Sequence, residues 1–303
     1  MKIFDCFIYS DEDMLLDVRL NTLSKYVDKF IIVEANYKHN GDKKNKNFNI
    51  EKFKNFENKI DYIFIEKMPN SLKTIKKDDS EDAQNSKKIQ NSIILEHHQR
   101  NMINEGLTSA INNDLILISD LDEIPILNNI DLEKNKNNLI FFKQKMFYYK
   151  FNLLYENFDW IGSKACKKKS FISPQWLRDT KNKKYPFWRL DTYFNNKKYI
   201  NVDYIENGGW HFTQIKSSRD IFSKLNTFAH HVDFKGSGLK LNDISKAVEE
   251  KKILYDHSVD KNKQDHKWIG TKTLKSINLD LMPDYISKNQ DRFKNWIDQQ
   301  STS

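Results

Sequence analysis

Apolar and polar positions along the first 125 residues follow a pattern that predicts strands separated by helices. The almost wholly apolar runs lie at residues 3–9, 29–34, 60–65 and 114–119. Such runs are typical of strands buried on both faces of a sheet. Over residues 12–26, leucine and valine recur at i, i+4, i+7 and i+11, which is the spacing of one helix face. Further helices are expected near residues 50–56 and over 82–111. Strands that alternate with helices predict an α/β fold with a mainly parallel central sheet.

The pattern changes in the second half of the chain. Residues 139–155 are aromatic-rich and strand-like, and tryptophans are spread through the polar segments that follow. We expect antiparallel strands and loops laid against the first half. Helical spacing returns in three segments near the C-terminus. These segments are residues 218–230, 242–252 and 283–297.

Composition narrows the function classes. The 303 residues are 38% hydrophobic and 30% charged, which is enough apolar material for a core. Two cysteines cannot supply a disulfide framework or a cysteine-based zinc site. No run of 18 apolar residues exists, and the N-terminus does not have the pattern of a signal peptide. A cytoplasmic location is therefore expected.

The net charge of +8 could serve nucleic acid, an anionic membrane or a phosphorylated substrate. Most of it is lysine interleaved with asparagine, which favours an ordinary solvated surface. Neither an arginine-rich recognition helix nor an aromatic RNA-binding motif is present, so we do not expect a nucleic-acid partner.

The strongest chemical signal follows the fourth apolar run, in the sequence S-D-L-D-E-I-P at 119–125. At a strand exit, Asp120 and Asp122 can direct both carboxylates at one spot. Two carboxylates suit Mg²⁺ or Mn²⁺, ions that complete their shells with water and substrate phosphates. Such an ion would stabilise a leaving diphosphate. A turn or a helix cap is the alternative explanation of the motif.

Two further motifs add polar groups. Arg100 stands in E-H-H-Q-R-N within the long predicted helix, where it could recognise a phosphate or pair with Glu96 four residues earlier. His211 stands in N-G-G-W-H-F, whose glycines permit positive φ and close backbone approach to a ligand. This histidine could complete a Mn²⁺ site or simply be packed and hydrogen-bonded. Two segments that combine tryptophan with arginine, at 173–178 and 185–189, suit sugar rings or bases, although packing is the commoner role of such tryptophans.

Taken in order, these motifs resemble glycosyltransferase family 17, the β-1,4-mannosyl-glycoprotein N-acetylglucosaminyltransferase family. The matching segments are F-D-C-F-I-Y-S-D-E-D-M-L-L-D-V-R-L-N-T-L at 4–23, V-D-K-F-I-I-V-E-A-N at 27–36, H-H-Q-R-N at 97–101, L-I-L-I-S-D-L-D-E-I-P at 115–125 and G-G-W-H-F at 208–212. They span about residues 4–232, and we find no match in the last seventy residues.

The resemblance implies a GT-A-like nucleotide-sugar-binding fold and an inverting transferase that uses a UDP-sugar, UDP-N-acetylglucosamine above all, with Mn²⁺ or Mg²⁺. It implies that Asp120 and Asp122 hold the metal and the diphosphate, that Arg100 faces the phosphates, and that Glu34 and Asn36 lie at the nucleotide end of the sheet. We accordingly expect three parts. These are a nucleotide-sugar-binding half at 1–130, an acceptor-side half of the same domain at 131–235 and a helical C-terminal extension at 236–303.

The acceptor and the general base are the least constrained parts of this prediction. The match begins at residue 4 with no membrane anchor before it, which favours a glycan, lipid-linked saccharide or polysaccharide acceptor and peripheral contact with an anionic membrane. An inverting transfer needs a carboxylate base, for which Glu206 is the first candidate, followed by Asp191 and Asp203. A metal-dependent phosphohydrolase using Asp120, Asp122 and His211 is one alternative function. A non-catalytic nucleotide-sugar or polyanion-binding protein is the other.

Overall fold

Four parallel strands form one end of the sheet in a computed structural model that describes residues 1–128, 139–228, 231–257, 268–270 and 272–299. Their spatial order is β3-β2-β1-β4. They are β1 (Ile3–Tyr9), β2 (Lys29–Ala35), β3 (Ile60–Ile65) and β4 (Leu115–Ile118). The predicted strands are thus confirmed at their predicted positions. The chain leaves β1 toward β2 on one side, whereas β4 pairs with β1 on the other, so the strand order reverses between β1 and β4.

The second half of the chain continues this sheet instead of lying against it. The strand β7 (Leu153–Lys167) pairs antiparallel with β4, and the order then runs β7-β6-β9-β5, with β10 on β7 and β8 on β6. The remaining strands are β5 (Glu123–Pro125), β6 (Leu139–Tyr148), β8 (Val202–Ile205), β9 (Gly209–Thr213) and β10 (Lys275–Ser276). The strands of the first half are parallel as expected, but the β6–β7 hairpin reverses the chain direction and makes the sheet as a whole mixed.

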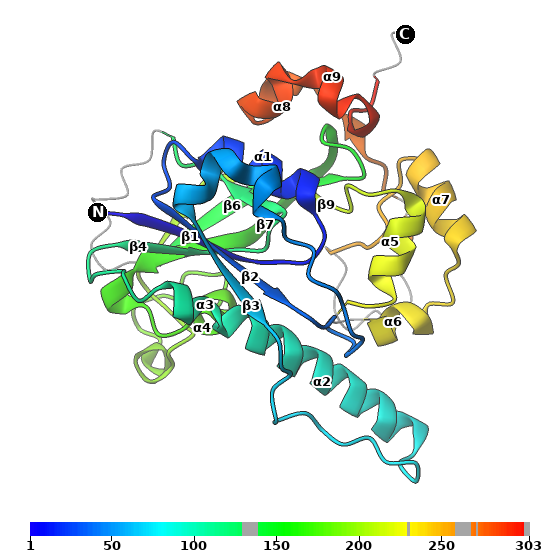
Figure 1. The fold of residues 1–303 in the computed structure, drawn as a ribbon, viewed down its shortest axis with the longest axis horizontal. Helices are drawn as coiled ribbons and strands as arrows, with labels where there is room; N and C mark the ends of the chain where they lie inside the picture. Colours follow the sequence, from blue (N-terminus) through cyan, green and yellow to red (C-terminus); the bar gives the residue numbers. More distant parts are fainter. Residues whose placement is uncertain (129–138, 229–230, 258–267, 271, 300–303) are drawn as a thin grey trace.

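Helices cover both faces of the sheet (Figure 1). On one face, α1 (Asp13–Leu23) packs its leucines against Phe7, Phe30 and the other side chains of a large apolar cluster. On the other face lie α2 (Glu81–Asn101), α3 (Ile103–Gly106) and α4 (Pro174–Asp179). The predicted helix over 82–111 is therefore two helices, and the second ends at Gly106.

The C-terminal segment belongs to the same core. It contains β10, η5 (Leu279–Leu281), α8 (Asp284–Lys288), α9 (Gln290–Phe293) and η6 (Lys294–Trp296). Its apolar side chains join the cluster around α1, where the rings of Phe293 and Phe151 lie 5.4 Å apart. The helix expected over 283–297 is broken into these short turns.

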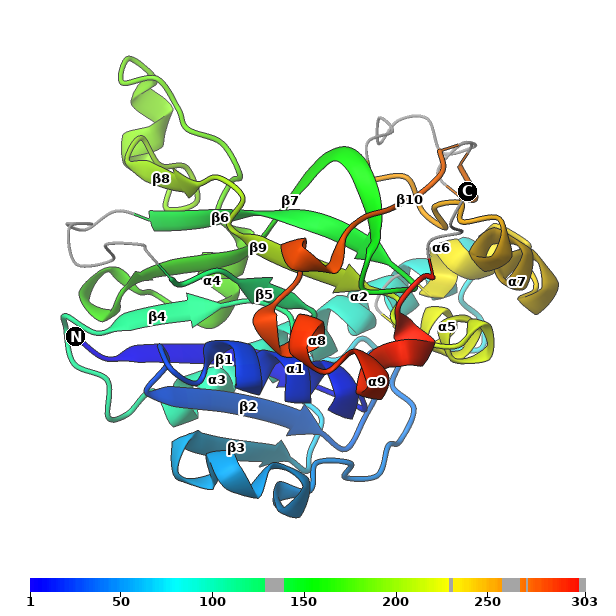
Figure 2. The same cartoon turned by 90° about the horizontal axis from the view of Figure 1, so that it is seen from above.

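A group of helices packs beside the carboxyl ends of the parallel strands (Figure 2). It consists of α5 (Ser218–Leu225), α6 (His231–Gly236) and α7 (Leu241–Glu249). Their apolar side chains form a separate cluster with Met146, Tyr148 and Tyr155 of β6 and β7. Short 3-10 turns complete the described chain: η1 (Ile50–Lys59), η2 (Lys168–Ser170) and η3 (Leu190–Phe194). Among the described residues, no helix combines the length and the apolar character needed to cross a bilayer.

Candidate active site

The loop that follows β4 is held rigidly from within the protein. The Asp120 backbone N–H donates to the Glu123 carboxylate (2.8 Å), and the Glu123 N–H donates to the Asp120 carbonyl (3.0 Å), which closes a tight turn. Arg19 reaches this turn from α1. It is fully buried, pairs with Asp5 of β1 at 2.5 Å, and donates to the carbonyls of Asp120, Leu121 and Glu123. The shape of the D-x-D loop therefore depends on a guanidinium located a hundred residues earlier.

Two more arginines bracket the Asp120 carboxylate. Arg100 of α2 lies 3.1 Å from one oxygen and Arg178 of α4 lies 2.7 Å from the other. Arg100 also pairs with Glu96 at 2.7 Å, which confirms the ion pair expected for it, and its side chain lines the cavity described below. Burial alone would raise the pKa of Asp120, but Arg178 and Arg100 outweigh it and hold that pKa well below its usual range.

Glu123 is the third carboxylate of the cluster. It accepts from Arg178 at 2.6 Å and from the Trp160 indole N–H at 2.6 Å. Gly162 of β7 makes room for it, because a Cβ at that position would lie 2.1 Å from the Glu123 carboxyl carbon. Two guanidiniums therefore face three carboxylates, those of Glu96, Asp120 and Glu123, which leaves a net negative charge beside Asp122.

Asp122 and His211 face each other at this negative centre. The His211 Nε2 lies 3.8 Å from the Asp122 carboxylate, and the imidazole packs on the Trp160 ring at 5.0 Å. Burial raises the pKa of Asp122 to about 7, and burial lowers the pKa of His211 to about 4. The His211 Nδ1 is buried and has no hydrogen-bond partner within the described residues. An unpartnered imidazole nitrogen in the interior is costly, which points to a ligand at this place.

A cavity of about 980 Å³ opens over these groups. One wall carries Ser10 and Asp11 after β1, and another carries the Asp120–Asp122 loop. Lys224 of α5 and Lys216, in the turn before that helix, line a further side. Lys224 pairs with Glu12 at 3.3 Å. The remaining wall is aromatic, and its members are Tyr148, Phe158, Trp160, Tyr255 and Trp268.

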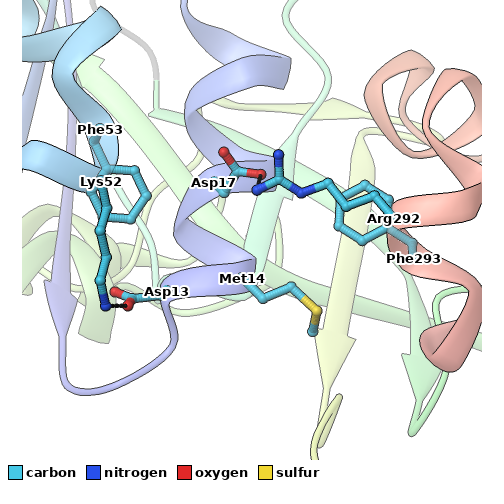
Figure 3. Close-up of a pocket in the computed structure, with 7 residues that line it drawn as sticks. All are labelled: Asp13, Met14, Asp17, Lys52, Phe53, Arg292 and Phe293. Atoms are coloured by element: carbon cyan, nitrogen blue, oxygen red, sulfur yellow. Dashed lines mark hydrogen bonds and ion pairs between the residues drawn. The ribbon is translucent and has the colours of Figure 1, made fainter.

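A second hollow, of about 460 Å³, lies between α1, η1 and α9 (Figure 3). Its floor is apolar, made by Met14, Phe53 and Phe293. Its charged groups pair with one another, Lys52 with Asp13 at 2.5 Å and Arg292 with Asp17 at 2.7 Å. These pairs join the C-terminal segment and η1 to α1, and they leave no polar group directed at a ligand.

The structure brings together four of the predicted site residues, Arg100, Asp120, Asp122 and His211. Glu34 does lie at the carboxyl end of β2, but its buried carboxylate is saturated. It accepts from Lys44, from the backbone N–H groups of Asn47 (2.8 Å) and Phe48 (3.0 Å), and from the Tyr62 hydroxyl. The Asn36 amide donates to the Glu66 carbonyl. These two residues shape the loop after β2 and do not line the cavity.

The three candidate bases do not line the cavity either. The Glu206 side chain is 63% exposed and pairs with Lys143 at 2.6 Å. Asp191 pairs with Arg189 and Lys198 on the surface, and Asp203 lies in β8. Glu206 is close to His211 in sequence only, because Asn207 at φ 48° and Gly209 at φ 140° turn the chain between β8 and β9.

The glycine pair at 208–209 approaches protein backbone and not a ligand. A Cβ on Gly209 would lie 2.2 Å from the Ile124 carbonyl, and a Cβ on Gly208 would lie 2.7 Å from the Ile205 carbonyl. Gly209 thus lets β9 pair closely with β5, which sets Glu123 opposite His211 in register, and Gly208 lets the turn before β9 lie against β6 and β8. The glycines were expected to allow close approach to a ligand, but in the structure they allow close packing of neighbouring strands.

Several residues of the site were not assigned to it from the sequence. Arg178 and Arg19 are two of only six arginines in a lysine-rich chain, and that scarcity was the available signal. Glu123 directly follows the D-x-D motif. Trp160 and Lys224 carried no local signal, since their role depends on how β7 and α5 pack around the loop.

The donor set around Asp122 fits a divalent cation. The Asp120 oxygens are already engaged by guanidiniums, and the described residues contain no group of three or more His, Cys, Asp or Glu placed to hold a metal ion. Asp122 and His211 nevertheless offer one oxygen and one nitrogen at a negatively charged centre. An ion such as Mg²⁺ or Mn²⁺ needs only one or two protein ligands when water and substrate phosphates fill the rest of its shell.

A mixed sheet with a carboxylate loop at its strand-order reversal, below a cavity of this size, is the arrangement in which α/β proteins bind their ligands. The model of glycosyltransferase family 17 matches residues 1–298. The chain therefore belongs to this family, and the protein is a glycosyltransferase. The match includes the last seventy residues, which the motifs had left unassigned, in accord with their place in the core. A search of the curated proteins matched none to this chain.

Proposed function

We propose that this glycosyltransferase has a GT-A-like site and transfers N-acetylglucosamine from a UDP-sugar to a glycan or lipid-linked saccharide, with inversion and with a divalent metal. The observation that carries the proposal is the position of the Asp120–Asp122 loop. It lies across from the β1 exit at the point where the strand order reverses, which is where open α/β sheets bind nucleotides.

The charges around the cavity suit a diphosphate that binds together with a cation, because the arginines and lysines there are already paired with carboxylates. Arg100 and Arg178 flank Asp120, while Lys216 and Lys224 approach from the α5 side. Asp122 and His211 would hold the metal, which would offset the charge that develops on the leaving diphosphate. The buried arginines are oriented before the substrate arrives, so they need little reorganisation during the reaction.

The aromatic wall supports binding of sugar rings. Trp160 is fixed by its hydrogen bond to Glu123, and Phe158 and Tyr255 line the cavity near it. The apolar faces of pyranose rings pack well on such side chains, and the few polar groups nearby would set the orientation.

The base is best sought among carboxylates of this wall. Asp256 lies between Tyr255 and His257, lines the cavity, and is oriented by the Tyr155 hydroxyl at 2.8 Å and by the Lys272 ammonium at 3.1 Å. In the proposed transfer it accepts the proton of the acceptor hydroxyl as that oxygen bonds to the anomeric carbon. The bond from that carbon to the diphosphate breaks at the same time, and UDP leaves with the electron pair.

The test is calorimetric titration with UDP-N-acetylglucosamine, UDP-glucose and UMP, with and without Mn²⁺, followed by assay of UDP release. We expect Mn²⁺-dependent binding of a UDP-sugar that Asp122→Asn weakens at least tenfold. Asp291→Asn, an exposed carboxylate on α9, is the matched control and should bind normally. Equal binding by Asp122→Asn would refute the metal assignment. Release of inorganic phosphate from simple esters would favour a phosphohydrolase instead.

A further inference from the structure

An unusual exposed apolar surface lies far from the cavity, on residues 181–199, which we call the aromatic loop. It follows α4 and leads into β8. Figure 2 shows this segment projecting from the sheet beside the label β8, on the side away from α5–α7. Its exposed large apolar side chains are Phe187 (72%), Trp188 (66%), Leu190 (73%), Tyr193 (66%) and Phe194 (91%).

This concentration stands out from the rest of the described surface. All the exposed large aromatic side chains of the described residues lie in this loop, whereas the other exposed apolar residues are single isoleucines, leucines or methionine at scattered positions. Scattered apolar residues are normal, but a contiguous group marks an interaction surface.

The loop is nevertheless an ordered part of the fold. Two hydrogen bonds close the base of the loop. The Lys181 backbone N–H donates to the Lys197 carbonyl (2.8 Å), and the Trp176 indole N–H donates to the Asn196 carbonyl (2.6 Å). Tyr185 is buried inside it, with the cations of Lys183, Arg189 and Lys198 around its ring. The polar and buried contacts thus fold the loop inward, and the large aromatic side chains are left pointing outward.

The charge of the loop indicates the partner. Residues 181–199 contain six cations, Lys181, Lys183, Lys184, Arg189, Lys197 and Lys198, and one carboxylate, Asp191. Tryptophan, tyrosine and phenylalanine beside lysine and arginine are the composition of surfaces that insert at the headgroup level of a bilayer. A second copy of this chain would instead bring two such loops together, each with six cations around the same patch.

We propose that the aromatic loop docks this protein on an anionic lipid surface, with its aromatic side chains at the headgroup–acyl boundary and its lysines on the lipid phosphates. The proposal is independent of the donor and acceptor assigned above. It depends only on the exposed surface of one loop, and vesicle binding tests it without any enzymatic turnover.

The test is co-sedimentation of the full chain with sucrose-loaded vesicles of phosphatidylcholine alone or with about one-third phosphatidylglycerol. We expect binding to the anionic vesicles, weaker binding to the neutral ones, and loss in high salt. The variant F187S/W188S/F194S should bind at least tenfold more weakly, because it loses the apolar area that would be buried. Lys183→Gln with Lys184→Gln should lose about fivefold for each cation removed.

Two control variants make the same kinds of substitution at other surface positions. I75S/I111S/L281S removes three exposed apolar side chains elsewhere on the surface, and K76Q/K77Q removes two exposed lysines from another loop. Both should bind as the unmodified protein does, and circular dichroism should show that every variant is folded. Failure of the unmodified protein to bind anionic vesicles would overturn the proposal. Equal losses in the control variants would also overturn it, as would a dimer in solution that the aromatic substitutions dissociate.

Discussion

Replacing Arg19 by methionine should destabilise the protein far more than an ordinary surface change. The Arg19 side chain is fully buried, and so is the side chain of its partner Asp5. The substitution leaves the Asp5 carboxylate in the interior without a counter-charge, which costs about 3–5 kcal/mol. It also removes donors from the carbonyls of Asp120, Leu121 and Glu123, and a buried acceptor left unpaired costs about 1–3 kcal/mol. Because these losses overlap, we expect at least about 4 kcal/mol in total.

The measurement is urea unfolding followed by tryptophan fluorescence, with the thermal midpoint as a second readout. Since a single domain gains about 2 cal/mol/K of unfolding entropy per residue, 4 kcal/mol corresponds to a drop of about 6 °C for a chain of 303 residues. Arg292→Met is the matched control, because that arginine is 58% exposed in its pair with Asp17 and should cost no more than about 1 kcal/mol.

Adding Asp5→Asn to Arg19→Met should restore part of the loss, since the amide carries no buried charge. The carbonyls would remain unpaired, so the D-x-D loop would stay displaced and transfer activity would stay low. A loss below about 1 kcal/mol for Arg19→Met, or full recovery of activity in the double variant, would refute the view that this guanidinium shapes the loop.

Four further predictions follow from the same contacts. Arg178→Lys should lower kcat/KM at least about tenfold, because an ammonium cannot bridge Asp120 and Glu123 together, and steady-state kinetics will show whether it does. Gly162→Ala should destabilise by about 1–3 kcal/mol in urea unfolding through its clash with Glu123, whereas Gly236→Ala, where a Cβ meets open space, should not. Although burial alone would raise it, Lys224 and Lys216 lower the pKa of Glu12 to about 2, so its contribution to stability is present above about pH 4.5 and is lost as the pH falls toward 2. Thermal midpoints between pH 5 and 2 should therefore fall less steeply in Glu12→Gln than in the unmodified protein, and Glu57→Gln on the surface should leave the slope unchanged. Asp256→Asn should reduce kcat more than Glu206→Gln does, and the opposite order would return the base to Glu206.

The parts of the fold that local pattern dictates were predictable. Apolar runs predicted the strands β1, β2, β3 and β4, and the D-x-D motif at the exit of β4 pointed to Asp120 and Asp122. Arg100 was recognisable because arginine is rare in this chain.

The contacts that complete the site depend on tertiary packing, and no local pattern in the sequence indicates them. Arg178 reaches Asp120 across 58 residues, and it does so because α4 packs against α2 and β7. Glu206 was misplaced for the same reason, since a positive-φ turn separates it from His211 although the two are five positions apart. The mixed order of the sheet likewise depends on the β6–β7 hairpin, whose second strand, β7, pairs with β4 only after the chain has folded back.

The unbroken sheet limits how substrates reach the active site. Four residues of β4 pair with β7, so a motion that parted the two halves of the molecule would break that ladder of hydrogen bonds. The cavity can widen at lower cost where α5 meets the β1–α1 turn, because the described residues there are joined by the ion pairs of Glu12 and Asp11 with Lys224 and Lys216 and by no strand pairing. Charge screening by salt weakens such pairs but leaves backbone pairing intact. Turnover limited by product escape would therefore accelerate with ionic strength, whereas turnover limited by bond making would not.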